Sequence, residues 1–201
     1  NGELTNGPKR AIGKIGQALD FDGSDDYVAA SALSSLANLG TVTVSAWINP
    51  KALVSGNTYT IFSKAYGNPV SMISGWNLNI ESGSVNSNVV SFNAEFGGDD
   101  MLAYTANNTI SLNQWQHVAA TWNGSTAASS LNFYVNGVLV GHASVNEINA
   151  TGSRTNDGDQ TPRIGLNNNG VSPFNGLIDD VRVYNRILIT DEIKRLYNMG
   201  R

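Results

Sequence analysis

The chain has 201 residues, 16 of them acidic and 12 basic, which gives a formal net charge of −4. It contains no cysteine, so disulfides, thiolate metal sites and a thiol nucleophile are excluded. Basic residues do not cluster and apolar runs stay far below the ~20 residues of a membrane span, so nucleic acid and a membrane span are not expected. Charged residues make up only 14%, and abundant Gly, Asn, Ser and Thr favour short strands joined by polar turns.

The chain begins with a glycine-rich, weakly patterned stretch over residues 1–17, which we interpret as an arm that covers a sheet edge or runs into the first strand. Alternating apolar and polar residues then indicate strands at short spacing. The segments that carry this pattern are, in chain order, QALDFDG, TVTVSAWINP, YTIFSKA, GWNLNIESG, NVVSFNAEFGG, WQHVAATWNG, SLNFYVNGVLVGHAS, RIGLN and GLIDDVRVYN.

Two local signals are stronger than the rest. Asn136-Gly137 stands between two apolar runs, which is the pattern of a tight β-hairpin. Near the end, ITDEIKRLYN predicts one short helix with Thr190 as its N-cap and acidic residues in its first turn, where they favour the helix dipole. Ten or more antiparallel strands imply two packed sheets, and we expect one domain over residues 1–201.

The ordered set of motifs resembles the laminin-G-like jelly-roll family, within the concanavalin A-like lectin/glucanase superfamily. The segments that carry the resemblance are ALDFDGSDDYV, TVTVSAWINP, WQHVAATWNG, LNFYVNGVLVG and FNGLIDDVRVYNRILITDEIKRLYN. The resemblance implies an all-β, two-sheet antiparallel jelly-roll sandwich with one short C-terminal helix. It also implies a mostly non-catalytic binding module, a structural Ca²⁺ ion, and an extracellular location in a larger secreted or cell-surface protein of bacterial origin.

Two adjacent aspartates near the start of the last strand raise a question of partners. Side chains alternate faces along a strand, which places Asp179 with Val181 on the apolar face and turns Asp180 outward toward nearby cations. A buried carboxylate needs a partner. The resemblance implies that Asp179 binds the Ca²⁺ ion together with Asp22 and the Gly23 carbonyl; the alternative is that backbone N–H groups or a basic side chain hold it.

The segments GWNLNIESG and NVVSFNAEFGG each present a polar face, and we expect them to pair as a hairpin. Asparagine and glutamate offer the donors and acceptors that sugar hydroxyls need, and the loops FGGDDMLAY and LNNNG would rim such a platform. The alternative is that these faces are simply solvated. The candidate glycan-binding residues are Asn77, Asn79, Asn93, Glu95 and Tyr104, with Tyr134 as a second aromatic candidate.

The other chemistry-bearing residues receive structural interpretations. The two histidines, His117 and His142, stand far apart in the sequence and are expected to be structural or exposed. Asp25 and Asp26 are expected to be solvated turn residues. We expect all four tryptophans to be core residues: Trp47, Trp76, Trp115 and Trp122.

Catalytic patterns of this superfamily are missing. The paired glutamates of retaining glucanases, E-x-D-x-x-E on one strand, do not occur, nor do the residue sets of the alginate lyases or the G-x-S-x-G and H-E-x-x-H motifs. The sequence therefore predicts a non-catalytic carbohydrate-binding module whose partner is a glycan or polysaccharide. The first alternative is a protein-interaction or adhesion domain, with an extracellular protein as its partner, and the second is a divergent polysaccharide-active enzyme.

Overall fold

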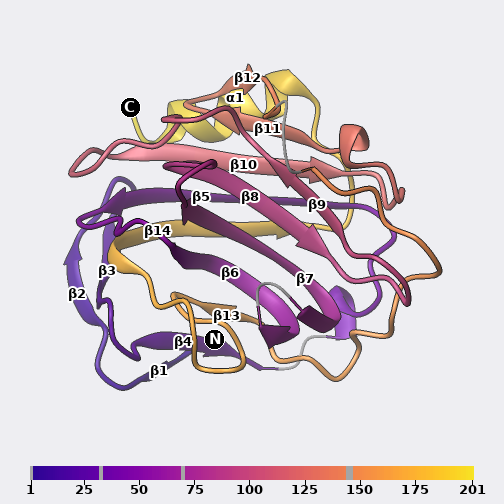
Figure 1. Cartoon of the computed structure of the whole chain (residues 1–201). Coiled ribbons are helices and arrows are strands. Elements are labelled where there is room, and N and C mark those ends of the chain that lie inside the picture. The colour runs from indigo at the N-terminus through magenta and orange to yellow at the C-terminus, as the bar shows by residue number, and fades with distance from the viewer. Residues whose placement is uncertain (1, 32–33, 69–70, 144–146) are drawn as a thin grey trace.

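A computed structural model describes residues 2–31, 34–68, 71–143 and 147–201, which form two packed antiparallel sheets of seven strands each (Figure 1). Sheet A contains, in spatial order, β1 (Gly2–Thr5), β4 (Tyr27–Ala30), β13 (Arg163–Ile164), β6 (Asn57–Asn68), β7 (Ser71–Ser82), β8 (Val89–Ala94) and β9 (Met101–Tyr104). Sheet B contains β12 (Val138–Val140), β11 (Asn132–Val135), β10 (Gln116–Trp122), β5 (Val42–Pro50), β14 (Asn175–Tyr184), β3 (Gln17–Asp22) and β2 (Lys9–Ile12).

The described residues also form three helical elements: the 3₁₀ turns η1 (Ser34–Leu36) and η2 (Ala128–Ser130) and the α-helix α1 (Thr190–Met199). The predicted all-β jelly-roll sandwich with one C-terminal helix is confirmed. None of the helices in the described part of the chain is long and apolar enough to cross a membrane.

The N-terminal arm is more regular than its sequence suggests. Asn1 lies outside the described residues, but the rest of the arm supplies β1 to the edge of sheet A and β2 to the edge of sheet B. Backbone pairing, to β4 and to β3 respectively, holds these strands. An alternating apolar pattern is not needed at a sheet edge that is largely exposed, which is why the pattern was weak.

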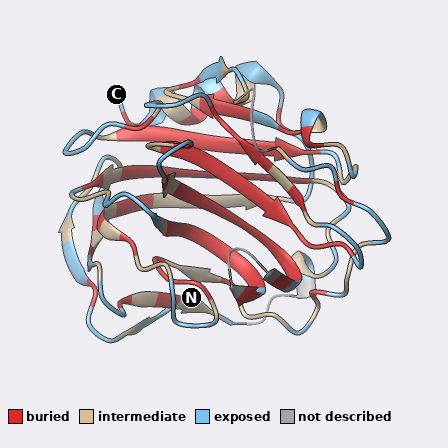
Figure 2. Ribbon diagram, viewed as in Figure 1, coloured by how far each residue is buried: buried red, intermediate tan, exposed pale blue. Residues whose placement is uncertain are grey.

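Apolar side chains fill the interior between the sheets in the alternation that the sequence predicts, and buried residues line the strands of both sheets (Figure 2). Aromatic rings run through the interior in a continuous series, with centroids 5.1 Å apart for Phe62 and Trp76, 5.8 Å for Trp76 and Phe92, and 5.7 Å for Phe92 and Trp122. Each of these side chains is almost fully buried. Burying one such ring stabilises the fold by about 2–3 kcal/mol, so this series holds the two sheets together.

A second, smaller apolar cluster lies on the outer face of sheet B, under α1. Trp47 points to this face from β5, is fully buried, and stacks on Tyr197 of the helix with ring centroids 5.5 Å apart. It is thus a packing residue, though not of the core between the sheets. Trp115 precedes β10 and is only half-buried, so the prediction that all four tryptophans are core residues is wrong for this one.

Local turn and cap chemistry explains two element boundaries. The hairpin between β11 and β12 turns at Asn136 and Gly137, both with positive φ, 52° and 75°, as the sequence predicts for a turn of this type. The predicted N-cap of α1 is wrong by one residue. Ile189 occupies that position without a side-chain cap hydrogen bond, and the Glu192 carboxylate in the first turn accepts the Ile189 backbone N–H at 3.1 Å.

Candidate functional site

The outer face of sheet A gathers the polar residues singled out in the sequence. β7 and β8 pair in the predicted hairpin, with Asn77 opposite Asn93 and Asn79 opposite Ser91, and β9 adds Tyr104 opposite Ser91. Residues opposite one another in antiparallel strands point to the same face. We call the set Asn77, Asn79, Ser91, Asn93 and Glu95 the polar face.

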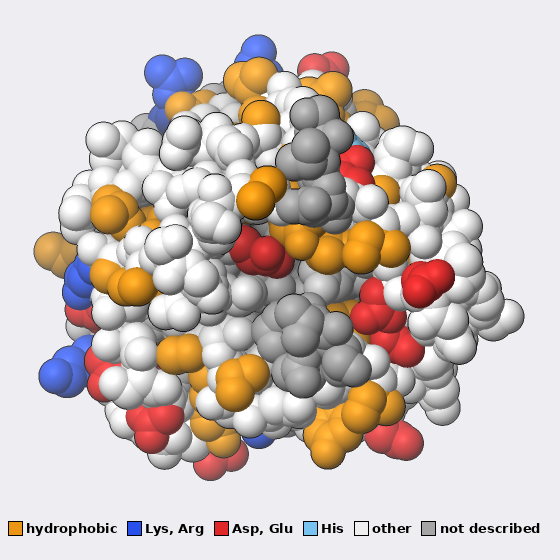
Figure 3. Space-filling view, in the orientation of Figure 1, with side chains coloured by type: hydrophobic (Ala, Val, Ile, Leu, Met, Phe, Trp, Pro, Cys, Tyr) orange, Lys and Arg blue, Asp and Glu red, His pale blue; other side chains and the backbone are white. Residues whose placement is uncertain are grey.

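The polar face is buried, so it is not the freely solvated surface that was the alternative expectation. The exposed fractions are 4% for Asn77, 2% for Asn79, 2% for Asn93 and 8% for Glu95. The amide groups of Asn79 and Asn77 are joined by a 2.8 Å hydrogen bond. Figure 3 looks onto this face and shows a hollow near its centre with acidic side chains beside it. The polar side chains are thus shielded from solvent, on a face whose surface is hollowed.

A pair of carboxyl groups lies at one end of the polar face. The loop after β8 carries Asp100 back to Glu95, which stands one residue beyond the strand. Burial, then the hydrogen bond and the charge of Asp100, raise the pKa of Glu95 to about 8. Glu95 therefore carries a proton at neutral pH and can donate a hydrogen bond as well as accept one. Asp100 was not among the candidate residues, although the loop FGGDDMLAY that contains it was expected to rim the polar platform.

The other end of the face is closed by Glu81 and Tyr104. Burial raises the pKa of Glu81, which a hydrogen bond from Ser91 partly offsets. Burial and the charge of Glu81 raise the pKa of Tyr104, whose side chain also bonds Asn86. Tyr104 is 7% exposed, so its ring offers no open stacking surface. Tyr134, the second aromatic candidate, packs against α1 from sheet B, far from this face, so its proposed role is wrong.

The last strand departs from simple alternation at its two aspartates. A bulge interrupts the pairing of β14 with β5 between Asp179 and Arg182, and Asp180 at the bulge has a φ of +47°. The extra residue shifts the faces by one position. Asp179 therefore lies opposite Trp47, on the outer face of sheet B, while Val181 packs into the core. The prediction that these two residues share a face is wrong.

Asp179 is nevertheless buried, and backbone amides hold it. Its Oδ2 accepts hydrogen bonds from the N–H groups of Lys14 and Ile15, both at 2.7 Å. A Cβ atom on Gly13 would lie 2.4 Å from the same oxygen, so glycine is required for the turn to close over the carboxylate. This is the backbone-capped alternative of the sequence analysis. Asp180 pairs with Arg182 at 2.8 Å, as its outward position suggested.

The structure does not bring the predicted calcium ligands together. Asp22 pairs with Asn175, four residues before Asp179, which places Asp22 about 13 Å along the strand from it and Gly23 farther still. The acidic group that does assemble is Asp22, Asp25 and Asp26, whose carboxylate oxygens lie within 4.8 Å of one another.

Within that group, Asp26 is not the solvated turn residue that was expected. It is 4% exposed rather than solvated, and its Oδ2 accepts the backbone N–H of Asp22 at 3.1 Å. Burial raises its pKa; the backbone hydrogen bond opposes this, and the charges of Asp22 and Asp25 add to it. Asp25 is exposed, as expected.

The two histidines have structural surroundings. His117 is buried beside Trp47, with ring centroids 5.4 Å apart, and burial lowers its pKa to about 4, so it is neutral at physiological pH. His142 bonds the Glu147 carboxylate at 2.8 Å and the Leu131 carbonyl at 2.7 Å. Neither histidine faces the polar face.

Comparisons with known proteins support the fold. The family model described as the concanavalin A-like lectin/glucanases superfamily matches residues 22–194. None of the curated proteins matches the chain. Domain 4 of AbnA, an extracellular GH43 arabinanase from Geobacillus stearothermophilus solved with arabinotriose, is 21% identical, with a TM-score of 0.59 over 98% of this chain and 87% of that one.

Two further structures show the same architecture. A heptameric SAP-like pentraxin from Limulus polyphemus is 16% identical, with a TM-score of 0.61 over 93% of this chain and 84% of that one. A structure of botulinum neurotoxin type C, described as dependent on two ganglioside molecules for cell entry, is 19% identical, with a TM-score of 0.63. The match covers all of this chain but 47% of the toxin chain. With the family match spanning most of its length, the chain belongs to the concanavalin A-like lectin/glucanase superfamily.

Proposed function

We propose that the protein is a non-catalytic carbohydrate-binding module of a larger secreted or cell-surface protein, and that the polar face of sheet A binds the glycan. The observation that carries the proposal is the set of amide and carboxyl side chains that β7 and β8 bring together and bury on this face, whose surface is hollowed. Polar side chains fixed by the sheet present donors and acceptors in set positions. Sugar hydroxyls require such an arrangement.

The structural neighbours give this proposal independent support. One was solved with arabinotriose bound, and another is linked by its description to gangliosides. At identities of 21% and 19% they share the fold with this chain, and fold alone does not set function. The support that is specific to this chain therefore comes from the residues of the polar face.

The carboxyl groups on this face favour binding over glycoside hydrolysis. Glycosidases place two carboxyl groups about 5–5.5 Å or about 6.5–9.5 Å apart. Glu95 and Asp100 are hydrogen-bonded to each other, so their carboxyl groups lie closer together than the shorter of these two spacings. Glu81 pairs with Val89 at the far end of β8, so it lies about 20 Å from Glu95, too far for the second.

A structural Ca²⁺ ion remains part of the proposal, with its ligands reassigned. Ca²⁺ takes six to eight oxygen ligands, with carboxylates foremost. Asp22, Asp25 and Asp26 offer carboxylate oxygens within 4.8 Å of one another, and Asp26 is held in place by burial. A cation there would offset the mutual repulsion of the three groups. Asp179 is not included, because it lies about 13 Å along the strand from Asp22 and its Oδ2 holds two N–H groups.

The test is a binding panel of neutral and acidic polysaccharides, with the same samples analysed for cleavage products. We expect at least one polysaccharide to be retained without being cleaved. Asn77→Ala and Leu102→Arg should each strongly weaken retention, because the first removes an amide from the polar face and the second puts bulk and charge beside Asn93. Asn132→Ala, an exposed asparagine of sheet B, is the matched control and should bind like the wild type.

Each other outcome has a definite meaning. A folded protein that retains no polysaccharide contradicts the proposal and leaves the protein-interaction alternative. Shortened products show a polysaccharide-active enzyme. Retention that survives both variants shows a glycan site elsewhere on the molecule.

A further inference from the structure

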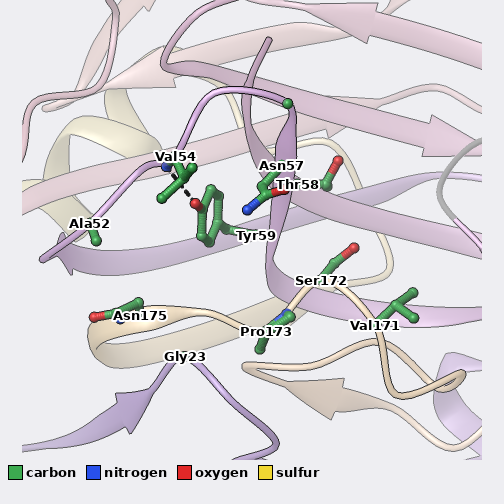
Figure 4. A pocket seen from close by; sticks show the side chains of 11 residues that line it. Gly23, Ala52, Val54, Asn57, Thr58, Tyr59, Val171, Ser172, Pro173 and Asn175 are labelled. Atoms are coloured by element: carbon green, nitrogen blue, oxygen red, sulfur yellow. Dashed lines mark hydrogen bonds between the residues drawn. The ribbon is translucent and has the colours of Figure 1, made fainter.

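A second recess lies at the end of the sandwich where β6 begins, away from the centre of the polar face (Figure 4). We call it the rim cavity. It has a volume of about 500 Å³, which falls in the range of small-molecule sites. One wall is the segment 52–59 that leads into β6, and the opposite wall is the segment 171–175 together with Gly23.

Backbone hydrogen bonds fix the two walls relative to each other. The N–H of Thr60 donates to the Ser172 carbonyl, and the N–H of Lys51 donates to the Asn175 carbonyl, both at 2.9 Å. The Tyr59 ring stands between the walls, and its hydroxyl accepts the Val54 N–H at 2.6 Å. The cavity is therefore preformed, and a ligand would pay little conformational cost on entering it.

All eleven lining residues are uncharged. The adjoining cavity, which shares Asn175, is different, since five charged side chains line it: Lys9, Asp20, Asp22, Asp26 and Lys51. An ionic ligand would lose hydration in the rim cavity without meeting an opposite charge. The ligand class that fits is uncharged.

The lining is also amphipathic. Val54 and Val171 are 60% and 42% exposed at the lips, and the Asn57 amide and the Thr58 and Ser172 hydroxyls offer polar groups beside them. None of these three polar side chains bonds another residue of the wall (Figure 4). A purely apolar ligand would leave these groups desolvated and unpaired.

The backbone conformation of Ser172 is a further unusual feature of this wall. Its φ is +64°, a conformation that costs a non-glycine residue energy and that is often found at binding sites. We propose that the rim cavity is a second binding site, separate from the polar face, for a neutral saccharide: an uncharged ligand with hydroxyl groups for the polar residues and apolar ring faces for the valines.

The test is an NMR titration of the ¹⁵N-labelled protein with arabinotriose, cellotriose or maltotriose at about 10 mM, enough to reveal millimolar binding. We expect the backbone amides of residues 54–59 and 171–175 to shift with at least one of them. Trigalacturonate, which is anionic, should leave these amides unmoved. The double variant Asn57→Ala/Thr58→Ala should weaken the response about tenfold, because it removes two hydrogen-bonding groups.

Two controls separate this site from the polar face. Ser55→Ala changes a neighbouring exposed residue outside the cavity lining and should titrate like the wild type. Asn77→Ala should abolish shifts on β7 and β8 but leave the rim shifts intact. The proposal is overturned if no neutral trisaccharide moves the rim amides, if trigalacturonate moves them equally, or if the double variant titrates unchanged. Rim shifts without shifts at the polar face would support this site and contradict the proposed function.

Discussion

At the residue scale, Asp179 shows how a buried carboxylate can be satisfied without a cation. Two backbone N–H groups of the turn after β2 donate to one of its oxygens, and hydrogen bonds to a charged acceptor are the stronger kind. They connect the N-terminal segment to β14, which is separated from β2 in sheet B by one strand, β3. Asp179 thus connects two parts of the sheet that are distant in sequence.

Replacing Asp179 by alanine should destabilise the protein by about 3 kcal/mol, because two partly buried N–H groups would lose their charged acceptor. Urea unfolding followed by tryptophan fluorescence measures this. The adjacent Asp180→Asn is the matched control: Asp180 is a partly exposed partner of Arg182, and asparagine tolerates its positive φ, so the loss should stay below about 1 kcal/mol. Equal losses in the two variants would refute the connecting role.

Glu95 should make stability depend on pH. Its pKa is raised from 4.5 to about 8 in the folded protein, so between these values the folded chain binds a proton that the unfolded chain has released. The free energy of unfolding should then fall as pH rises through this interval. Thermal unfolding from about pH 5 to pH 8 should show a steeper decline in the wild type than in Glu95→Gln. Parallel curves would mean that Glu95 is ionised in the folded state.

At the element scale, β7 and β8 differ from ordinary half-buried strands because both of their faces are buried. The alternation of Trp76, Leu78 and Ile80 with polar residues was enough to predict the strands and their inner face. It was not enough to predict that the polar side is recessed, because that depends on segments remote in sequence. The loop bearing Asp100 is one such segment, and nothing in the strand pattern specifies where it folds.

The bulge in β14 illustrates a different limit. Periodicity predicts faces only while the chain adds one residue per pair, and one extra residue at Asp180 reverses the pattern for all that follows. No glycine marks this bulge, because an aspartate adopts the left-handed conformation. The strand itself was predictable from sequence, whereas the position of Asp179 and the separation of the calcium candidates were not.

A buried ion cluster joins β6 to the loop that precedes β13. Asp157 is fully buried, and its two carboxylate oxygens lie 3.0 Å from Lys64 Nζ and 3.0 Å from Arg154. Asp157→Asn would leave the buried Lys64 and the half-buried Arg154 without their counter-charge and should cost about 3–5 kcal/mol. In chemical denaturation, Asp20→Asn, which breaks the exposed pair with Lys51, should cost less than about 1 kcal/mol. A small loss at Asp157 would show that the cluster does not hold the loop.

At the scale of the whole molecule, the two sheets and their closing helix form a frame that presents separate recesses on one side and at one end. The frame follows from patterns that the sequence displays: alternating strands, one hairpin turn and one amphipathic helix. The rim cavity follows from no such pattern, since its walls come from loops around residues 23, 52–59 and 171–175. The cavity therefore depends on loop conformations that the strand and helix patterns do not predict.

The calcium proposal concerns the stability of the whole fold. Removing the ion with EDTA should lower the melting temperature and added Ca²⁺ should restore it, with a stabilisation of about 2.7 kcal/mol at ~100 times the Kd. Asp26→Asn should lose this response, while Asp179→Asn should keep it because its carboxylate is used by backbone amides. Differential scanning calorimetry measures both. A response that disappears with Asp179 instead would restore the original ligand assignment.

We propose that the polar face of sheet A binds a glycan without cleaving it. Isothermal titration calorimetry with the oligosaccharide retained best in the panel tests this directly. We predict that Asn79→Ala weakens the Kd about tenfold, as expected for a lost buried hydrogen bond, that Asn132→Ala leaves it unchanged, and that the oligosaccharide is recovered intact. An unchanged Kd for a folded Asn79→Ala protein, or recovery of shortened products, would contradict the claim.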